Sequence, residues 1–275
     1  MRVLSTDSLP GVVRRALSTA SIGWSSSITF ATLGTAITTL VLVPGLNVLF
    51  TVLLGADLAA NDTVRIGCAT ALIATLSSVA AGIVARVATD RWIGVFEYVC
   101  TARPVDADYW LGAAAVPALL ASVTGLSNVG IVWLLSLTEP STGAGSGLLL
   151  GAIALMPAAI LGGVCLGIFA AGLGLYLSDP YTGSNVLSIV LPVSAGVIVP
   201  VSTYPAWLAW VCSWVPGSRL VQALDTSGGI ASTAPDLFTL LAADAALAVL
   251  YAAIGLGLTF LAARRIRAGA RASLL

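Results

Sequence analysis

The residues that could carry chemistry in this chain are few, because the sequence contains no histidine and no lysine and its four cysteines are widely separated, mostly within apolar runs. The absence of imidazole excludes histidine general bases, Ser-His-Asp triads and histidine-ligated zinc or haem. Asp106 and Asp108 stand two residues apart and Asp179 precedes Pro180, but neither place has the cluster of carboxylates that a metal ion requires. We therefore expect no catalytic residue and no metal site, and a membrane-embedded enzyme has the least support.

The composition predicts an all-α membrane protein. Of the 275 residues, 58% are hydrophobic and only 9% are charged, whereas soluble domains carry about 25% charged residues. The chain has too few charges to cover a water-exposed surface of its size. Its 12 basic and 12 acidic residues cancel, which excludes the strong basic field of a nucleic-acid partner. We treat residues 1–275 as a single transmembrane domain.

Six apolar stretches have the length of a membrane span. An α-helix rises about 1.5 Å per residue, so crossing a hydrocarbon core of about 30 Å takes about 20 residues. The predicted spans are residues 34–54, 64–84, 111–137, 148–177, 186–201 and 237–263. Residues 1–33 precede the first span, and within them residues 9–30 are too polar to cross. They predict either a helix lying in the membrane interface or a disordered tail.

Arginine placement predicts the sidedness of the chain. Ten of the 12 basic residues, all arginine, lie in three clusters: before the first span, between the second and third, and after the sixth. An even number of spans separates these clusters, which places all three on one side, and short cytoplasmic segments carry the excess of positive charge. We expect a multi-pass protein of the plasma (inner) membrane of a bacterium, with both termini in the cytoplasm.

The connection between the second and third spans, residues 88–110, is longer than a minimal loop. Trp92, Ile93, Phe96 and Cys100 recur at helical spacing, which predicts a short amphipathic helix at the cytoplasmic surface. Pro104 ends this helix because proline has no backbone donor. The helix either binds a partner or only packs beneath the bundle.

The segment between the fifth and sixth spans, residues 200–229, is interrupted by prolines. The runs between them are too short to span, which predicts two short re-entrant helices in the outer leaflet with a break at Pro216 and Gly217. Trp207, Trp210 and Trp214 form one stripe at helical spacing. The stripe is either an aromatic belt at the outer interface or a surface for stacking a ligand.

Both irregular segments resemble those of ABC-2 type transporter permeases. The first matches the pattern of glycine, glutamate, threonine, proline and glycine in the family's cytoplasmic coupling helix. The matching residues are Gly94, Glu97, Thr101, Pro104 and Gly112. In the family the proline usually follows the threonine directly, whereas here Ala102 and Arg103 separate the two. The second matches a proline and tryptophan pattern at Gly196, Pro200, Pro205, Trp207, Leu208 and Pro216. The order and spacing of the motifs make the resemblance specific across nearly the whole chain.

The resemblance implies an exporter built from two permease subunits, as a homodimer or a paralogous heterodimer, each docked on an ATP-binding subunit. This chain has no phosphate-binding loop and no lysine to hold phosphates, so ATP and Mg²⁺ are expected on the partner and no cofactor on this chain. Glu97 would be the charged contact to the partner, and Trp92 and Phe96 the apolar contacts. Pro104 would pass motion to the third span, and Pro200, Pro205, Trp207, Pro216 and Gly217 would form an outer gate.

The substrate is constrained only by small hydroxyl residues in the second and fifth spans: Thr70, Thr75, Ser78, Ser188 and Ser194. Among apolar neighbours they suit a pathway for an amphiphilic or hydrophobic molecule such as a drug, lipid or peptide. The alternative is that these small residues serve close helix packing.

A secondary transporter or channel is the alternative function. Coupling to protons or sodium needs ionisable residues at membrane depth, and Asp244 in the sixth predicted span is the sole candidate. The alternative role of Asp244 is structural, as the partner of Arg65 or Arg219.

Overall fold

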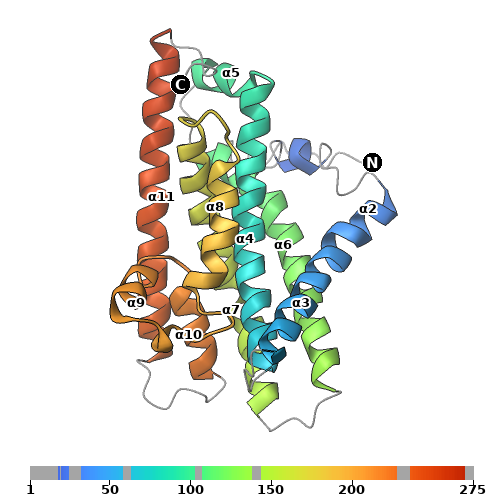
Figure 1. Ribbon diagram of the computed structural model, residues 1–275. Helices are drawn as coiled ribbons and strands as arrows, with labels where there is room; N and C mark the ends of the chain where they lie inside the picture. The colour runs from blue at the N-terminus through green and yellow to red at the C-terminus, as the bar shows by residue number, and fades with distance from the viewer. Residues whose placement is uncertain are drawn as a thin grey trace.

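A computed structural model describes residues 18, 20–24, 32–57, 63–102, 107–137, 144–227 and 236–269. These residues form helices and no strand (Figure 1). The helices are α2 Leu33–Ile37, η2 Thr38–Leu42, α3 Val43–Asp57, α4 Thr63–Trp92, α5 Val95–Ala102, α6 Ala107–Ser136, α7 Ala144–Gly174, α8 Thr182–Ser194, η3 Val201–Thr203, α9 Ala206–Cys212, α10 Ser218–Ser227 and α11 Leu237–Arg267. Of the predicted interfacial segment, residues 20–24 are helical, whereas Arg14 and Arg15 lie outside the described residues.

Five helices are long and apolar enough to cross a membrane, which makes the fold that of a multi-pass helical membrane protein. They are Leu33–Asp57, Thr63–Trp92, Tyr109–Ser136, Gly145–Gly174 and Leu237–Arg267. Each overlaps one of the predicted spans, so the apolar lengths in the sequence located these five helices correctly.

The fifth predicted span differs from the structure. Residues 186–201 were expected to form it, but α8 covers Thr182–Ser194, only 13 residues or about 20 Å of helix. The helix ends because Gly196 adopts a left-handed conformation with a φ of 68°, which glycine tolerates and other residues rarely do. The apolar run continues past the helix end, so hydropathy did not reveal the turn.

The two ends of the bundle differ in charge. Arg91 at the end of α4 and Arg264, Arg265 and Arg267 at the end of α11 lie at the end that also carries α5 (Figure 1). We call this the arginine-rich end. Helices α9 and α10 lie at the opposite end (Figure 1). The chain enters α8 at the arginine-rich end, because Arg91 donates to the carbonyls of Gly174 and Leu177 just before it, at 2.7 and 2.8 Å.

Helix α4 forms the centre of the bundle and packs against α3, α6, α7 and α8. Small residues let the helices approach closely, as is common in membrane bundles. Helices α7 and α11 meet backbone to backbone at Gly172 and Gly255, where an added Cβ at either position would lie 2.5–2.6 Å from the backbone of the other helix.

The first span is bent away from the bundle at a π-helical turn. Residues Thr38–Leu42 form this turn, directly before Pro44 in α3. Pro44 has no N–H to donate to the carbonyl of Leu40, and that carbonyl accepts a hydrogen bond from the hydroxyl of Ser127 on α6 at 3.2 Å. Helix α2 then diverges from α4 and α6 toward the arginine-rich end (Figure 1).

Candidate functional site

The predicted surface helix at the arginine-rich end is present, but it is shorter than expected. Gly94 has a φ of 76° and interrupts the helix, so Trp92 ends α4 and Ile93 lies in the turn, while α5 runs from Val95 to Ala102. The carbonyl of Gly94 accepts from the backbone N–H of Tyr98 at 3.4 Å, which starts the new helix. Pro104 lies outside the described residues.

Phe96 does not have the exposure that its predicted role requires. Its side chain is 0% exposed and packs with Cys100 in a core cluster with α4, α6 and α11. The apolar residues at helical spacing face the bundle because that is where an amphipathic helix buries them. The assignment of Phe96 as an apolar contact to a partner is therefore wrong, and its position is that of an anchor.

The residues that α5 and its preceding turn expose are a different set. Trp92, Ile93 and Val95 are exposed, and Tyr98 is 80% exposed. We call these four residues the apolar patch. Glu97 lies beside it, half-buried, and Thr101 is exposed with its hydroxyl bonded to the carbonyls of Glu97 and Tyr98 at 3.0 Å. Tyr98 was not among the predicted residues. It lies midway between Phe96 and Cys100, which places it on the opposite, outward face of the helix.

Two contacts fasten α5 to the long helices, and a third links two of those helices to each other. The rings of Phe96 and Tyr109 on α6 lie 6.4 Å apart, and the Tyr109 hydroxyl donates to Asp90 on α4 at 3.1 Å. Arg267 on α11 donates to the carbonyl of Cys100 at 2.8 Å. Burial raises the pKa of the Cys100 thiol to about 11, so this thiol stays protonated at neutral pH. Through these contacts α5 is connected to α4, α6 and α11.

The break at the opposite end is present where it was predicted. Gly217 has a φ of 99° and separates α9 from α10, and Pro216, Gly217 and Ser218 are all buried. The other expected gate residues do not join them. Pro200 and Pro205 are exposed N-caps of η3 and α9, and Trp207 is exposed on α9.

The three tryptophans of α9 and the turn after it are exposed, as a belt at a membrane interface requires. The rings of Trp210 and Trp214 meet edge to face with their centroids 6.1 Å apart. Neither ring is enclosed in a pocket, so the arrangement favours the belt over the stacking of a ligand.

Asp244 has structural partners at the start of α10, and Arg219, one of the two expected residues, is among them. Its carboxylate accepts from the backbone N–H of Gly217 at 3.0 and 3.3 Å. This hydrogen bond satisfies a donor at the start of α10 and fixes the break against α11. Asp244 was expected to pair with Arg65 or Arg219. Arg219 interacts with the carboxylate, whereas Arg65 pairs with Asp225.

Arg65 at the start of α4 forms a buried ion pair with Asp225 on α10. Its Nε and Nη2 atoms lie 2.6 and 2.8 Å from the two carboxylate oxygens, a bidentate geometry. The guanidinium also donates to the carbonyls of Val197 and Gly196 at 3.3 and 3.5 Å. One side chain therefore joins α4, the end of α8 and α10. From the sequence, Arg65 was named only as a possible partner of Asp244.

The predicted pathway residues do not line one channel. Thr70, Thr75 and Ser194 are buried, and each hydroxyl donates to a carbonyl of its own helix at 2.7 to 3.3 Å. Ser188 is exposed on α8, and Ser78 lines a cavity on another side of α4. The five residues therefore lie on different surfaces, and the hydroxyls of the buried three are bonded within their own helices, as the packing alternative expects.

A comparison with protein-family models finds no match for this chain, and a comparison with curated proteins finds none either. The function is therefore inferred from the geometry described above.

Proposed function

We propose that this chain is the membrane-spanning subunit of an ATP-driven exporter of the ABC-2 type. In this proposal a separate ATP-binding subunit supplies ATP and Mg²⁺, and the chain moves an amphiphilic or hydrophobic substrate. The observation that carries the proposal is α5, a short helix that exposes the apolar patch at the arginine-rich end while Phe96, Cys100 and Arg267 hold it against the long helices. Exposed aromatic residues on a rigid support are typical of a docking surface.

The complete exporter would contain two such subunits, identical or paralogous. The first span supports this, because the rest of the chain covers little of it: Leu46, Phe50 and Leu53 on α3 are exposed. A second copy or membrane lipid covers this face in the proposed assembly. The Pro216 and Gly217 break would close the path at the opposite end, held by Asp244. That hydrogen bond gives Asp244 a positional role and makes a transporter coupled through Asp244 the weaker alternative.

The coupling role of α5 predicts a loss of stimulated ATPase activity in two variants. The variants are Glu97→Ala and Tyr98→Ala, each co-expressed with the cognate ATP-binding subunit and reconstituted in liposomes. Each should lower substrate-stimulated ATP hydrolysis about tenfold or more. Truncating an aromatic anchor removes about 2 kcal/mol of binding free energy. Both residues are at least partly exposed, so the free energy of unfolding should change by less than about 1 kcal/mol.

The matched control is Phe238→Ala at the opposite end. Phe238 is 82% exposed and Tyr98 is 80% exposed, so the two truncations remove a similar exposed ring. Phe238→Ala should retain stimulation. Normal stimulation in both α5 variants, with assembly intact, would show that α5 does not couple the two subunits.

The proposed sidedness predicts which positions an impermeant reagent reaches. Ser227 at the end of α10 and Thr182 at the start of α8 are both exposed and lie at opposite ends of the bundle. In a cysteine-free background and intact cells, Ser227→Cys should react with an impermeant maleimide and Thr182→Cys should react only after the membrane is permeabilised. The reverse pattern would invert the topology, and labelling of both in intact cells would reject it.

A further inference from the structure

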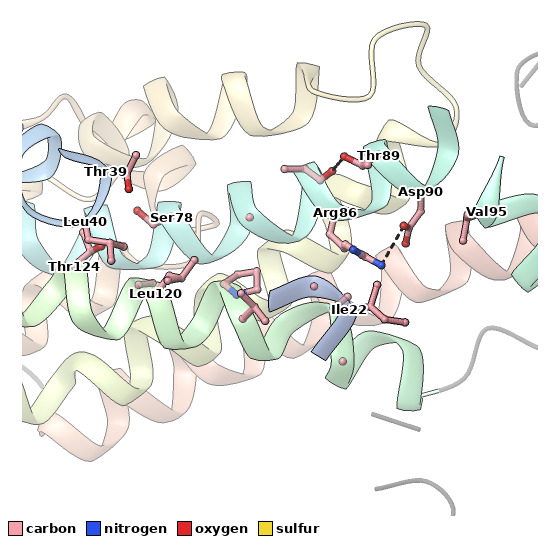
Figure 2. Close-up of a pocket in the computed structure, with 18 of the residues that line it drawn as sticks. Ile22, Thr39, Leu40, Ser78, Arg86, Thr89, Asp90, Val95, Leu120 and Thr124 are labelled. Carbon is pink, nitrogen blue, oxygen red and sulfur yellow. Dashed lines mark hydrogen bonds and ion pairs between the residues drawn. The ribbon is translucent and has the colours of Figure 1, made fainter. Parts of the chain in front are cut away.

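A cavity of about 730 Å³ lies between the first span and helices α4 and α6 (Figure 2). Thr39, Leu40 and Pro44 line it from the first span, at the π-helical turn where that span diverges from the bundle. Ile22 and Gly23 border it toward the arginine-rich end. Ile93 and Val95 of the apolar patch border the cavity at this end, and the proposed function uses none of its other lining residues.

The charge in the cavity is confined to one end. Among the described residues that line it, Arg86 and Asp90 on α4 are the charged ones, and their Nη2 and Oδ1 atoms lie 3.4 Å apart. The other Asp90 oxygen accepts from Tyr109. The Asp90 side chain is 4% exposed, whereas that of Arg86 is 21% exposed. The group that this end presents to a ligand is therefore the cation, because the carboxylate is almost fully buried and the guanidinium is not.

The rest of the lining suits a hydrocarbon chain. Beyond Arg86 the walls are mainly apolar or small, with Ser78 on α4 and Val116 and Leu120 on α6. From Arg86 to Ser78 the distance along α4 is about 12 Å, which approaches half of a hydrocarbon core of about 30 Å. The cavity thus extends from near the membrane surface at the arginine-rich end toward the midplane.

We propose that this cavity binds one anionic phospholipid from the leaflet at the arginine-rich end. The phosphate lies against the Arg86 guanidinium, which Asp90 and Tyr109 hold in place, and an acyl chain lies between α4 and α6. A zwitterionic headgroup is disfavoured because Asp90, the carboxylate that could meet its ammonium, is only 4% exposed. Binding requires this chain alone, so it does not depend on the proposed ATP-driven function.

Titration of the purified full chain in detergent tests the charged end, with native mass spectrometry as the readout. The probes are dioctanoyl phosphatidylglycerol and dioctanoyl phosphatidylcholine. The parent chain should bind one phosphatidylglycerol at least tenfold more tightly than phosphatidylcholine. Arg86→Gln/Asp90→Asn, which removes both charges of the ion pair, should remove this preference, as expected for the loss of a charged hydrogen bond. The control Arg264→Gln, an exposed arginine at the same end, should retain it.

A second pair of variants tests the apolar part. Ser78→Phe fills the cavity and should weaken binding of both lipids at least tenfold, whereas Ser188→Phe on the exposed side of α8 should not. Lipid binding by a variant is compared with that of the parent only if the variant keeps the parent's thermal midpoint of unfolding. Equal binding of the two lipids by the parent, an equal loss in Arg264→Gln, or normal binding in Ser78→Phe would overturn the proposal. Glycerol phosphate binding as tightly as the lipid would also overturn it, because the acyl chain would then contribute nothing.

Discussion

Replacing Arg65 with methionine is expected to lower the free energy of unfolding by about 3–5 kcal/mol, because removing one partner of a buried ion pair leaves the other charge without compensation. The methionine would also leave the carbonyls of Gly196 and Val197 without the donor that they now share. Unfolding of the purified chain in mixed micelles with increasing denaturing detergent measures the difference. Helix α10 and the turn at Gly196 should also become more accessible to protease.

The double variant Arg65→Met/Asp225→Leu separates the pair from the loss of packing. With both charges gone, stability should recover most of the loss, as is common when a buried ion pair is replaced by apolar side chains. Arg264→Met is the control for removing an exposed arginine and should change stability by less than about 1 kcal/mol. A single variant as stable as the parent would mean that the pair contributes nothing to the folded state.

Gly255→Ala is expected to cost about 3 kcal/mol, at the upper end of the usual penalty for overpacking. The new Cβ would lie 2.5 Å from the Cα of Phe169 and 2.6 Å from the carbonyl oxygen of Ile168. Both are backbone atoms, so they cannot move aside by changing a rotamer, and α11 would have to separate from α7.

Gly257→Ala, two residues further along α11, is a matched control. An added Cβ there has nothing within 4 Å, and alanine favours a helix over glycine by about 1 kcal/mol. Gly257→Ala should therefore be neutral or stabilising in the same unfolding assay. Equal effects at the two positions would contradict the backbone contact between α7 and α11.

The elements that follow from composition alone were predicted well. Five apolar stretches correspond to the five long helices, because crossing hydrocarbon demands a minimum apolar length. The break at Pro216 and Gly217 was also located, since proline and glycine impose their backbone geometry locally.

The features that depend on three-dimensional context were missed. The length of α8 is set by the turn at Gly196, which lies inside an apolar run. Periodicity placed Phe96 on an apolar face, but whether such a face meets the bundle or a partner depends on the rest of the fold. The pairing of Arg65 with Asp225 was not predicted, because a pair separated by 160 positions leaves no local pattern in the sequence.

That separation also sets an order of events during biosynthesis. A ribosome adds about 5–20 residues per second, so Arg65 is made about 8–30 s before Asp225, which lies 160 residues further along the chain. Throughout this interval α4 carries a cation whose carboxylate partner does not yet exist. Helix α10 can take its place only after α6, α7 and α8 have been synthesised, which makes closure of this end of the bundle a late step in assembly.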